Sequence, residues 1–241
     1  MAWSWIRIVA AVGGLSGVAA GFIVNVDRAA RLDQDLGAVL ANFFSLFTII
    51  SVTLGAIILL SAAVWSLRHP GTSPEPLAIA LALAAVTGPI LLLGIVYNVL
   101  LRGAPSGIAI PDPPVIAALD TWAVESLHVV VPLYFLVDLL FAPRRRGLPW
   151  WSLAVIVGYP VLWAAYTMVR GELVGNPDGS TTWWYPYPFL DRHGPGGYGS
   201  ALLYIAGIML AFLLIGWGIV AIGRARERRA QRRAEAAAVP A

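Results

Sequence analysis

The chain contains no cysteine and no lysine, and it is poor in charged residues of either sign. Without cysteine, disulfides, thiolate nucleophiles and Cys-based zinc or iron–sulfur sites are excluded. Charged residues make up 12% of the 241 residues and hydrophobic residues 59%, whereas soluble domains carry about 25% charged residues. This balance predicts an integral membrane protein that forms one bundle.

Six segments are long and apolar enough to cross a hydrocarbon core, which takes roughly 20 helical residues. We therefore expect an all-α, integral membrane bundle of six transmembrane helices, with a six-helix domain at residues 1–223 and a basic tail at residues 224–241. The expected helices cover residues 5–24, 38–67, 77–101, 115–141, 150–169 and 198–222.

The distribution of arginine predicts the orientation of this bundle. Of the 16 arginines, 11 lie at the N-terminus, in the second and fourth loops and in the tail, and five lie on the opposite side. Cytoplasmic segments are enriched in arginine, so both termini are expected in the cytoplasm of a multi-pass cell-membrane protein. The tail is expected to be a helical extension attracted to anionic lipid headgroups, not to nucleic acid.

A polar residue recurs at every third position of the stretch NFFSLFTIISV, namely Asn42, Ser45, Thr48 and Ser51. Small polar residues let membrane helices approach one another, and we expect this role for Ser45 and Ser51. A threonine in such a helix often bonds the carbonyl one turn back, here that of Phe44. A hydroxyl that does chemistry is the alternative interpretation of Thr48.

The fourth expected helix carries four ionisable residues, which cost at least ~2.5–3.5 kcal/mol each at membrane depth and usually face a partner or a cavity. His128 lies near the middle, at an estimated depth similar to that of Thr48, and Glu125 precedes it by one turn. A neutral imidazole can take the proton of a threonine hydroxyl, and Glu125 can orient the ring. A structural bridge between helices is the other interpretation of His128. Asp120 and Asp138 are expected to cap, to pair with arginine or to lie near headgroups.

The last loop contains STTWWYPYPFLDRHGPGGYG, in which aromatic residues alternate with prolines that exclude a helix interior. Tryptophan and tyrosine favour the membrane interface, so the loop is expected to be an aromatic anchor. The alternative is a re-entrant lid over an opening between helices. Its entrance residues would be Trp184, Tyr185, Tyr187 and Asp191.

Three short motifs resemble the androgen-induced family of multi-pass membrane proteins, particularly its prokaryotic relatives. They are FFSLFT at 43–48, LHVVVP at 127–132 and WYPYPFLD at 184–191. Animal members of that family are threonine hydrolases that cleave fatty acid esters of hydroxy fatty acids with an intramembrane Thr and His. The resemblance implies that Thr48 is the nucleophile and that His128 is its partner.

The chain departs from the family pattern one turn after the threonine. The prokaryotic pattern has Ser-Asn beginning three positions after the threonine, whereas this chain has Ser51 followed by Val52. An amide that would hold the substrate or complete an oxyanion site is therefore missing there. A replacement donor would have to come from Asn42 or Asn98.

The residues and the resemblance together predict a membrane hydrolase of lipid carboxylic esters. No metal-ligand spacing is visible, so we expect neither a metal nor another cofactor. Its partners would be a lipid-like substrate and membrane lipids, not nucleic acid, and the sequence specifies no protein partner. Two other functions stay open: a proton-linked transporter with Glu125, His128 and Asp138 as relay groups, and a non-catalytic lipid-binding or scaffolding protein.

Overall fold

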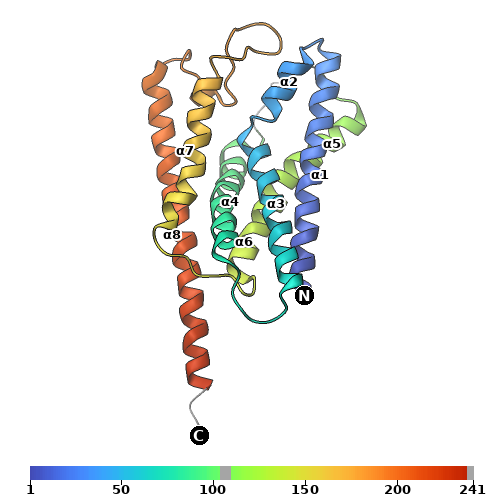
Figure 1. Ribbon diagram of the computed structural model, residues 1–241. Coiled ribbons are helices and arrows are strands. Elements are labelled where there is room, and N and C mark those ends of the chain that lie inside the picture. Colours follow the sequence, from blue (N-terminus) through green and yellow to red (C-terminus); the bar gives the residue numbers. More distant parts are fainter. Residues whose placement is uncertain (104–109, 238–241) are drawn as a thin grey trace.

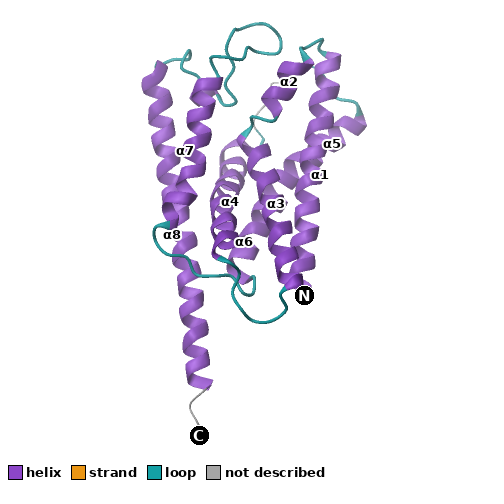
Figure 2. Cartoon of the chain, viewed as in Figure 1, coloured by secondary structure: helices purple, strands orange, loops and turns teal. Residues whose placement is uncertain are grey.

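The computed structural model describes residues 1–103 and 110–237, and every regular element in these ranges is a helix (Figures 1 and 2). Within these ranges, six helices are long and apolar enough to cross a membrane, which confirms the expected all-α bundle. The elements are α1 (Ala2–Arg31), α2 (Leu36–Phe43), α3 (Phe47–Arg68), α4 (Leu77–Val96), the π-helical η1 (Tyr97–Leu101), α5 (Pro114–Glu125), the π-helical η2 (Ser126–Val130), α6 (Val131–Phe141), α7 (Ser152–Arg170), the short 3₁₀ helix η3 (Pro188–Leu190) and α8 (Gly197–Ala237).

Helix α4 occupies the centre of the bundle, in contact with α3, α6, α7 and α8. Figure 1 shows α7 and α8 side by side on one side of α4, with α1 and α3 on the other. Helix α8 continues without a break beyond the rest of the bundle to Ala237, so the described part of the basic tail is the helical extension expected from the sequence.

The outer surface of the bundle is apolar, as a hydrocarbon environment requires. Val9, Leu162 and Leu203 are 70%, 72% and 75% exposed, and they come from three different helices. The interior is apolar as well, with Leu83 and Phe135 fully buried. A water-soluble protein rarely exposes apolar residues over so much of its surface, which agrees with a membrane-spanning bundle.

The second expected helix, over residues 38–67, is interrupted, so the prediction of one continuous helix is wrong. Helix α2 ends at Phe43, and α3 begins at Phe47 after Leu46 adopts an extended conformation (φ −62°, ψ 132°). An interruption leaves backbone groups without helical partners, which is tolerated at membrane depth only where the protein supplies others. Trp163 of α7 supplies a donor for the Ser45 carbonyl, and a hydrophobicity pattern does not reveal such a partner.

The fourth expected helix is continuous, but it contains a π-helical turn around His128. Pro132 has no N–H, so the carbonyl of His128 loses the donor that an α-helix would give it. Asn98 Nδ2, from the π-helical turn η1, donates to that carbonyl at 3.0 Å. Such π turns inside α-helices are frequent at functional sites.

Gly14 of α1 lies beside residues of both α3 and α6. A Cβ at this position would come within 3.2 Å of Val52 Cγ1 and 3.3 Å of Val131 Cγ2. Helices α3 and α6 run in the same direction (Figure 1). Thr48 precedes Val52 by four residues and His128 precedes Val131 by three, so the two residues lie at comparable heights along the bundle.

Substituting Gly14→Val is expected to destabilise the bundle by about 1–3 kcal/mol, because overpacking forces neighbouring side chains from their positions. Gly13→Val is the matched control, since a Cβ on Gly13 would meet nothing within 4 Å. Thermal unfolding of both variants in detergent measures the difference. Equal unfolding midpoints would contradict the close approach at Gly14.

Candidate active site

The start of α3 presents free backbone donors inside the bundle. The first helical bond runs from Ile50 N–H to the Leu46 carbonyl at 3.1 Å. In the described part of the chain, the N–H groups of Phe47, Thr48 and Ile49 have no hydrogen-bond acceptor. These orphan donors and the helix dipole favour negative charge at this point.

Side chains of α7 brace the interruption between α2 and α3, which Figure 2 shows as a short loop. Trp163 Nε1 donates to the Ser45 carbonyl at 3.1 Å, and the Ser45 hydroxyl lies 2.9 Å from that of Tyr166. The Ser51 hydroxyl makes a 2.9 Å bond with that of Tyr159. Ser45 and Ser51 thus have the packing role that the sequence suggests.

Thr48 differs from these two serines. It is buried (8% exposed), and its hydroxyl makes no hydrogen bond to Phe44, whose carbonyl belongs to the interruption and not to the same helix. The hydroxyl of Tyr187, from the aromatic loop, faces the Thr48 side chain. Burial raises the pKa of Tyr187, and its interaction with Thr48 opposes that rise.

His128 is held in a defined tautomer. Its Nδ1 lies 3.0 Å from the Val124 carbonyl, and its ring stacks on Tyr97 with the ring centroids 4.5 Å apart. A carbonyl oxygen only accepts, so Nδ1 carries the hydrogen and the neutral ring keeps its lone pair on Nε2. Nε2 makes no hydrogen bond within the ranges that the structure describes. The Nε2 lone pair is therefore available to accept a hydrogen bond.

The structure gives different positions to the predicted supporting residues. The Glu125 carboxylate pairs with Arg102 at 2.8 and 3.0 Å, and the His128 ring is oriented by Val124 and Tyr97 instead. Arg102 Nε in turn donates to Asn98 Oδ1 at 3.0 Å. Since Asn98 Nδ2 bonds the carbonyls of Gly94 and His128, this amide braces the π-helical turns and has no free donor.

Asn42 has a free donor. Arg170 Nη2 donates to Asn42 Oδ1 at 2.9 Å, whereas the buried Nδ2 has no partner in the part of the chain described. Asn42 is the second-to-last residue of α2, just before the interruption, and lies at the same end of α3 as Thr48. Of the two asparagines expected from the sequence, Asn42 is thus the one with an amide N–H to offer.

The aromatic loop folds against the start of α3, and its parts have different roles. Tyr187 packs on Trp163 with the ring centroids 6.0 Å apart, and its hydroxyl interacts with the Thr48 side chain. Trp184 lies against the Arg170 guanidinium, 5.5 Å from its ring centroid. Asp191 accepts from the His193 backbone N–H at 2.9 Å and so shapes the loop itself.

Glu172 accepts hydrogen bonds from several residues of this loop and so holds it in place. Its carboxylate accepts from the Tyr185 hydroxyl and from Arg192 Nε, both at 2.5 Å, and His193 Nε2 lies 3.2 Å away. The hydrogen bond from Arg192, followed by that from Tyr185, lowers the pKa of Glu172 to about 2. Tyr185 is therefore a structural part of the loop.

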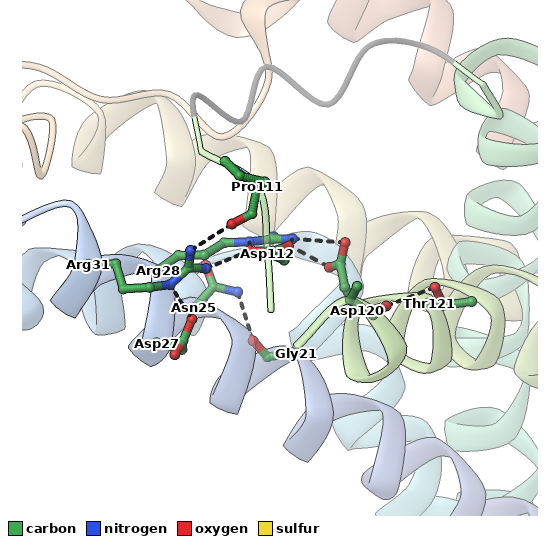
Figure 3. Close-up of polar contacts among 10 residues, drawn as sticks. Gly21, Asn25, Asp27, Arg28, Arg31, Pro111, Asp112, Asp120 and Thr121 are labelled. Carbon is green, nitrogen blue, oxygen red and sulfur yellow. Dashed lines mark hydrogen bonds and ion pairs between the residues drawn. The ribbon is translucent and has the colours of Figure 1, made fainter. Parts of the chain in front are cut away.

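A second polar cluster joins α1 to the start of α5, at the same end of the bundle as the aromatic loop (Figure 3). Arg28 Nη2 lies 2.5 Å from Asp112 and 3.0 Å from Asp120, so Asp120 pairs with arginine as the sequence suggests. Arg31 also donates to Asp112 at 2.6 Å. The bond from Arg28 and then that from Arg31 lower the pKa of Asp112 to about 2.

Asp138 lies at the opposite end of the bundle, fully buried among donors. Arg7 Nε and Trp3 Nε1 each donate to Asp138 Oδ1 at 2.8 Å, and Arg145 donates to Oδ2 at 2.7 Å. Asp138 is therefore a structural ion-pair partner of arginine, remote from Thr48 and His128.

Sequence reasoning missed three groups at the site: the free N–H groups of α3, the Val124 carbonyl and Tyr97. Pro132 is the signal that predicts a freed carbonyl at His128, whereas no local signal predicts the interruption before Phe47. No cluster of His, Asp and Glu fit to hold a metal ion occurs among the described residues. No family model, curated protein or solved structure matches the chain.

Acidification is expected to loosen the aromatic loop through Glu172. The pKa of this carboxyl lies below its ordinary value of 4.5, so its contacts contribute stability above about pH 4.5 and lose it as the pH falls toward 2. Pepsin, which is active over this range, should cleave the loop several-fold faster at the lower end. Glu172→Gln should be cleaved rapidly at both ends, and a pH response equal to that of the wild type would contradict the assignment.

Proposed function

We propose that the protein is an intramembrane hydrolase of lipid carboxylic esters, with Thr48 as nucleophile and His128 as general base. The observation that carries the proposal is the start of α3, where a buried threonine hydroxyl adjoins free backbone N–H groups at a height in the bundle comparable to that of His128. The resemblance of the FFSLFT and LHVVVP motifs to membrane threonine hydrolases points to the same two residues.

In the first half of the reaction, Thr48 Oγ1 attacks the ester carbonyl carbon while His128 Nε2 takes its proton. The carbonyl oxygen becomes negative in the tetrahedral intermediate, and N–H groups at the start of α3 stabilise it together with the Asn42 amide. The bond to the alcohol then breaks, and His128 returns the proton to the leaving oxygen.

In the second half, water attacks the acyl-threonine ester. His128 takes a proton from this water, the bond from the acyl carbon to Thr48 Oγ1 breaks, and the proton returns to Thr48. The π-helical turn at 126–130 and the Asn98 brace would keep the imidazole in place through both halves. The products are a fatty acid and an alcohol.

The substrate class follows from the surroundings of the site. Thr48 and His128 belong to the apolar bundle, so an ester with long acyl chains would reach them from the lipid phase between helices. Tyr187 covers Thr48 from the loop side, and its movement would admit the polar end of the substrate or the water for deacylation. A narrow crevice beside α7 is lined by Ser45, Tyr166 and Trp184.

The contacts of the proposed relay groups argue against the transporter alternative. Glu125 is paired with Arg102, and Asp138 with Arg7 and Arg145, so both carboxylates are neutralised by fixed cations. A proton relay needs groups that exchange protons along a connected path.

The departure from the family pattern at Val52 has a structural explanation, because the Val52 side chain is buried against Gly14.

The central test is hydrolysis of lipid esters by the purified chain in detergent. Thr48→Ala should abolish turnover and labelling by a fluorophosphonate probe, whereas His128→Ala should reduce turnover by about 10²–10⁴-fold, the usual contribution of a general base. Thr53→Ala, in the same helix, and His69→Ala, in an exposed loop, are the matched controls. Equal turnover in all of these proteins would overturn the assignment.

The absence of native cysteine allows a direct test of the distance between Thr48 and His128. The double variant Thr48→Cys, His128→Cys should bind one Cd²⁺ ion or form a bridge with a short bifunctional thiol reagent. The pair Thr53→Cys, His128→Cys is the control, because residue 53 lies on another side of α3. Failure of the first pair to bridge in the folded protein would remove the physical basis of the mechanism.

A further inference from the structure

A cavity of about 440 Å³ opens at the end of the bundle where α1 begins and α3 ends, the end that also carries the extension of α8 (Figure 1). It is distinct from the candidate active site, which lies toward the other end of α3. The polar residues that line it are Trp3, Ser4, Arg7, Ser66, Thr72 and Arg144.

Arg144 is a fixed cation in the cavity wall, and it has no acidic partner within the described ranges. Its Nε donates to the Ser73 carbonyl at 2.6 Å and its Nη1 to the His69 carbonyl at 2.8 Å. Its guanidinium also lies 4.4 Å from the centroid of the Trp65 ring. These contacts hold the guanidinium in place without neutralising it and leave Nη2 free.

Arg7 forms the base of the cavity and is 2% exposed. Its Nε and Nη2 donate to Asp138, which is also bound by Arg145, and Nη1 makes no hydrogen bond in the part of the chain described. Glu75 lies 3.6 Å from Arg7 Nη2. Burial is the main cause that raises the pKa of Glu75, which favours its neutral form and leaves positive charge in excess.

The hydroxyls of Ser4, Ser66 and Thr72 complete the lining. None of the three has a hydrogen-bond partner among the residues that the structure describes, so each can donate to a ligand in the cavity. Two guanidinium groups and three hydroxyls around one cavity form a donor-rich site with unbalanced positive charge. An anion with several acceptor oxygens is the ligand that such a site fits.

We propose that this cavity binds a phosphate group, carried by an anionic phospholipid headgroup or by a free phosphate or phosphate ester. Guanidinium groups match the geometry of phosphate oxygens and bind them through charge-assisted hydrogen bonds. The volume lies in the range of small-molecule sites, roughly 300–1,000 Å³. The site stands at an end of the bundle, where a lipid headgroup and a dissolved anion both have access.

Two titrations of the full chain separate the two sources. Inorganic phosphate is titrated into the protein in neutral detergent by calorimetry, and retention of phosphatidylglycerol against phosphatidylcholine is measured in nanodiscs by native mass spectrometry. Saturable binding in the first experiment identifies a soluble phosphate, and selective retention in the second alone identifies a lipid headgroup. If neither experiment shows binding, the proposal is overturned.

Arg144→Gln should weaken the binding by about tenfold or more, because one charge-assisted contact is lost. Arg146 lies two residues further along the chain and does not line the cavity. Arg146→Gln removes the same charge, and the affinity of this variant for phosphate should stay within about twofold of that of the wild type. Equal weakening in both variants would show a non-specific effect of charge and overturn the site. Should Arg144→Gln lower the unfolding midpoint, Ser66→Ala decides the matter: about threefold weaker binding supports the site, and unchanged binding overturns it.

Discussion

In an apolar environment every backbone N–H and C=O group needs a hydrogen-bond partner, and this requirement shapes the molecule. The interruption before Phe47 and the proline at position 132 each free backbone groups inside the bundle. Trp163 satisfies the Ser45 carbonyl, and Asn98 satisfies that of His128. The donors at the start of α3 are left over, and they lie beside the threonine for which we propose a catalytic role.

Ion pairs at both ends of the bundle hold α1 against the α5–α6 helix. Arg28 pairs with Asp120 at one end, and Arg7 pairs with Asp138 at the other. Buried or half-buried ion pairs often add little net stability, but they select one register, because a shifted helix would leave charges unpaired. With both ends fixed, Gly14 of α1 lies beside Val52 of α3 and Val131 of α6.

Ring stacking and one carbonyl decide the state of His128. The Val124 carbonyl fixes the hydrogen on Nδ1, and Tyr97 holds the plane of the ring. Glu125 contributes through Arg102 and Asn98, which brace the same turn, and not through a direct bond to the imidazole. The site is thus built from backbone groups and an aromatic ring in places where a soluble triad would use a carboxylate.

The sequence by itself determined the all-α class, the number of membrane-length helices and the packing role of Ser45 and Ser51, because apolar length and residue size act locally along the chain. It also indicated comparable depths for Thr48 and His128, from residue counts alone. Only the tertiary structure decided where α3 begins, since the donor for the Ser45 carbonyl in the interruption comes from Trp163 of α7, which is distant in sequence. Only it distinguished Asn42 from Asn98, because the partners of an amide come from helices that are distant in sequence.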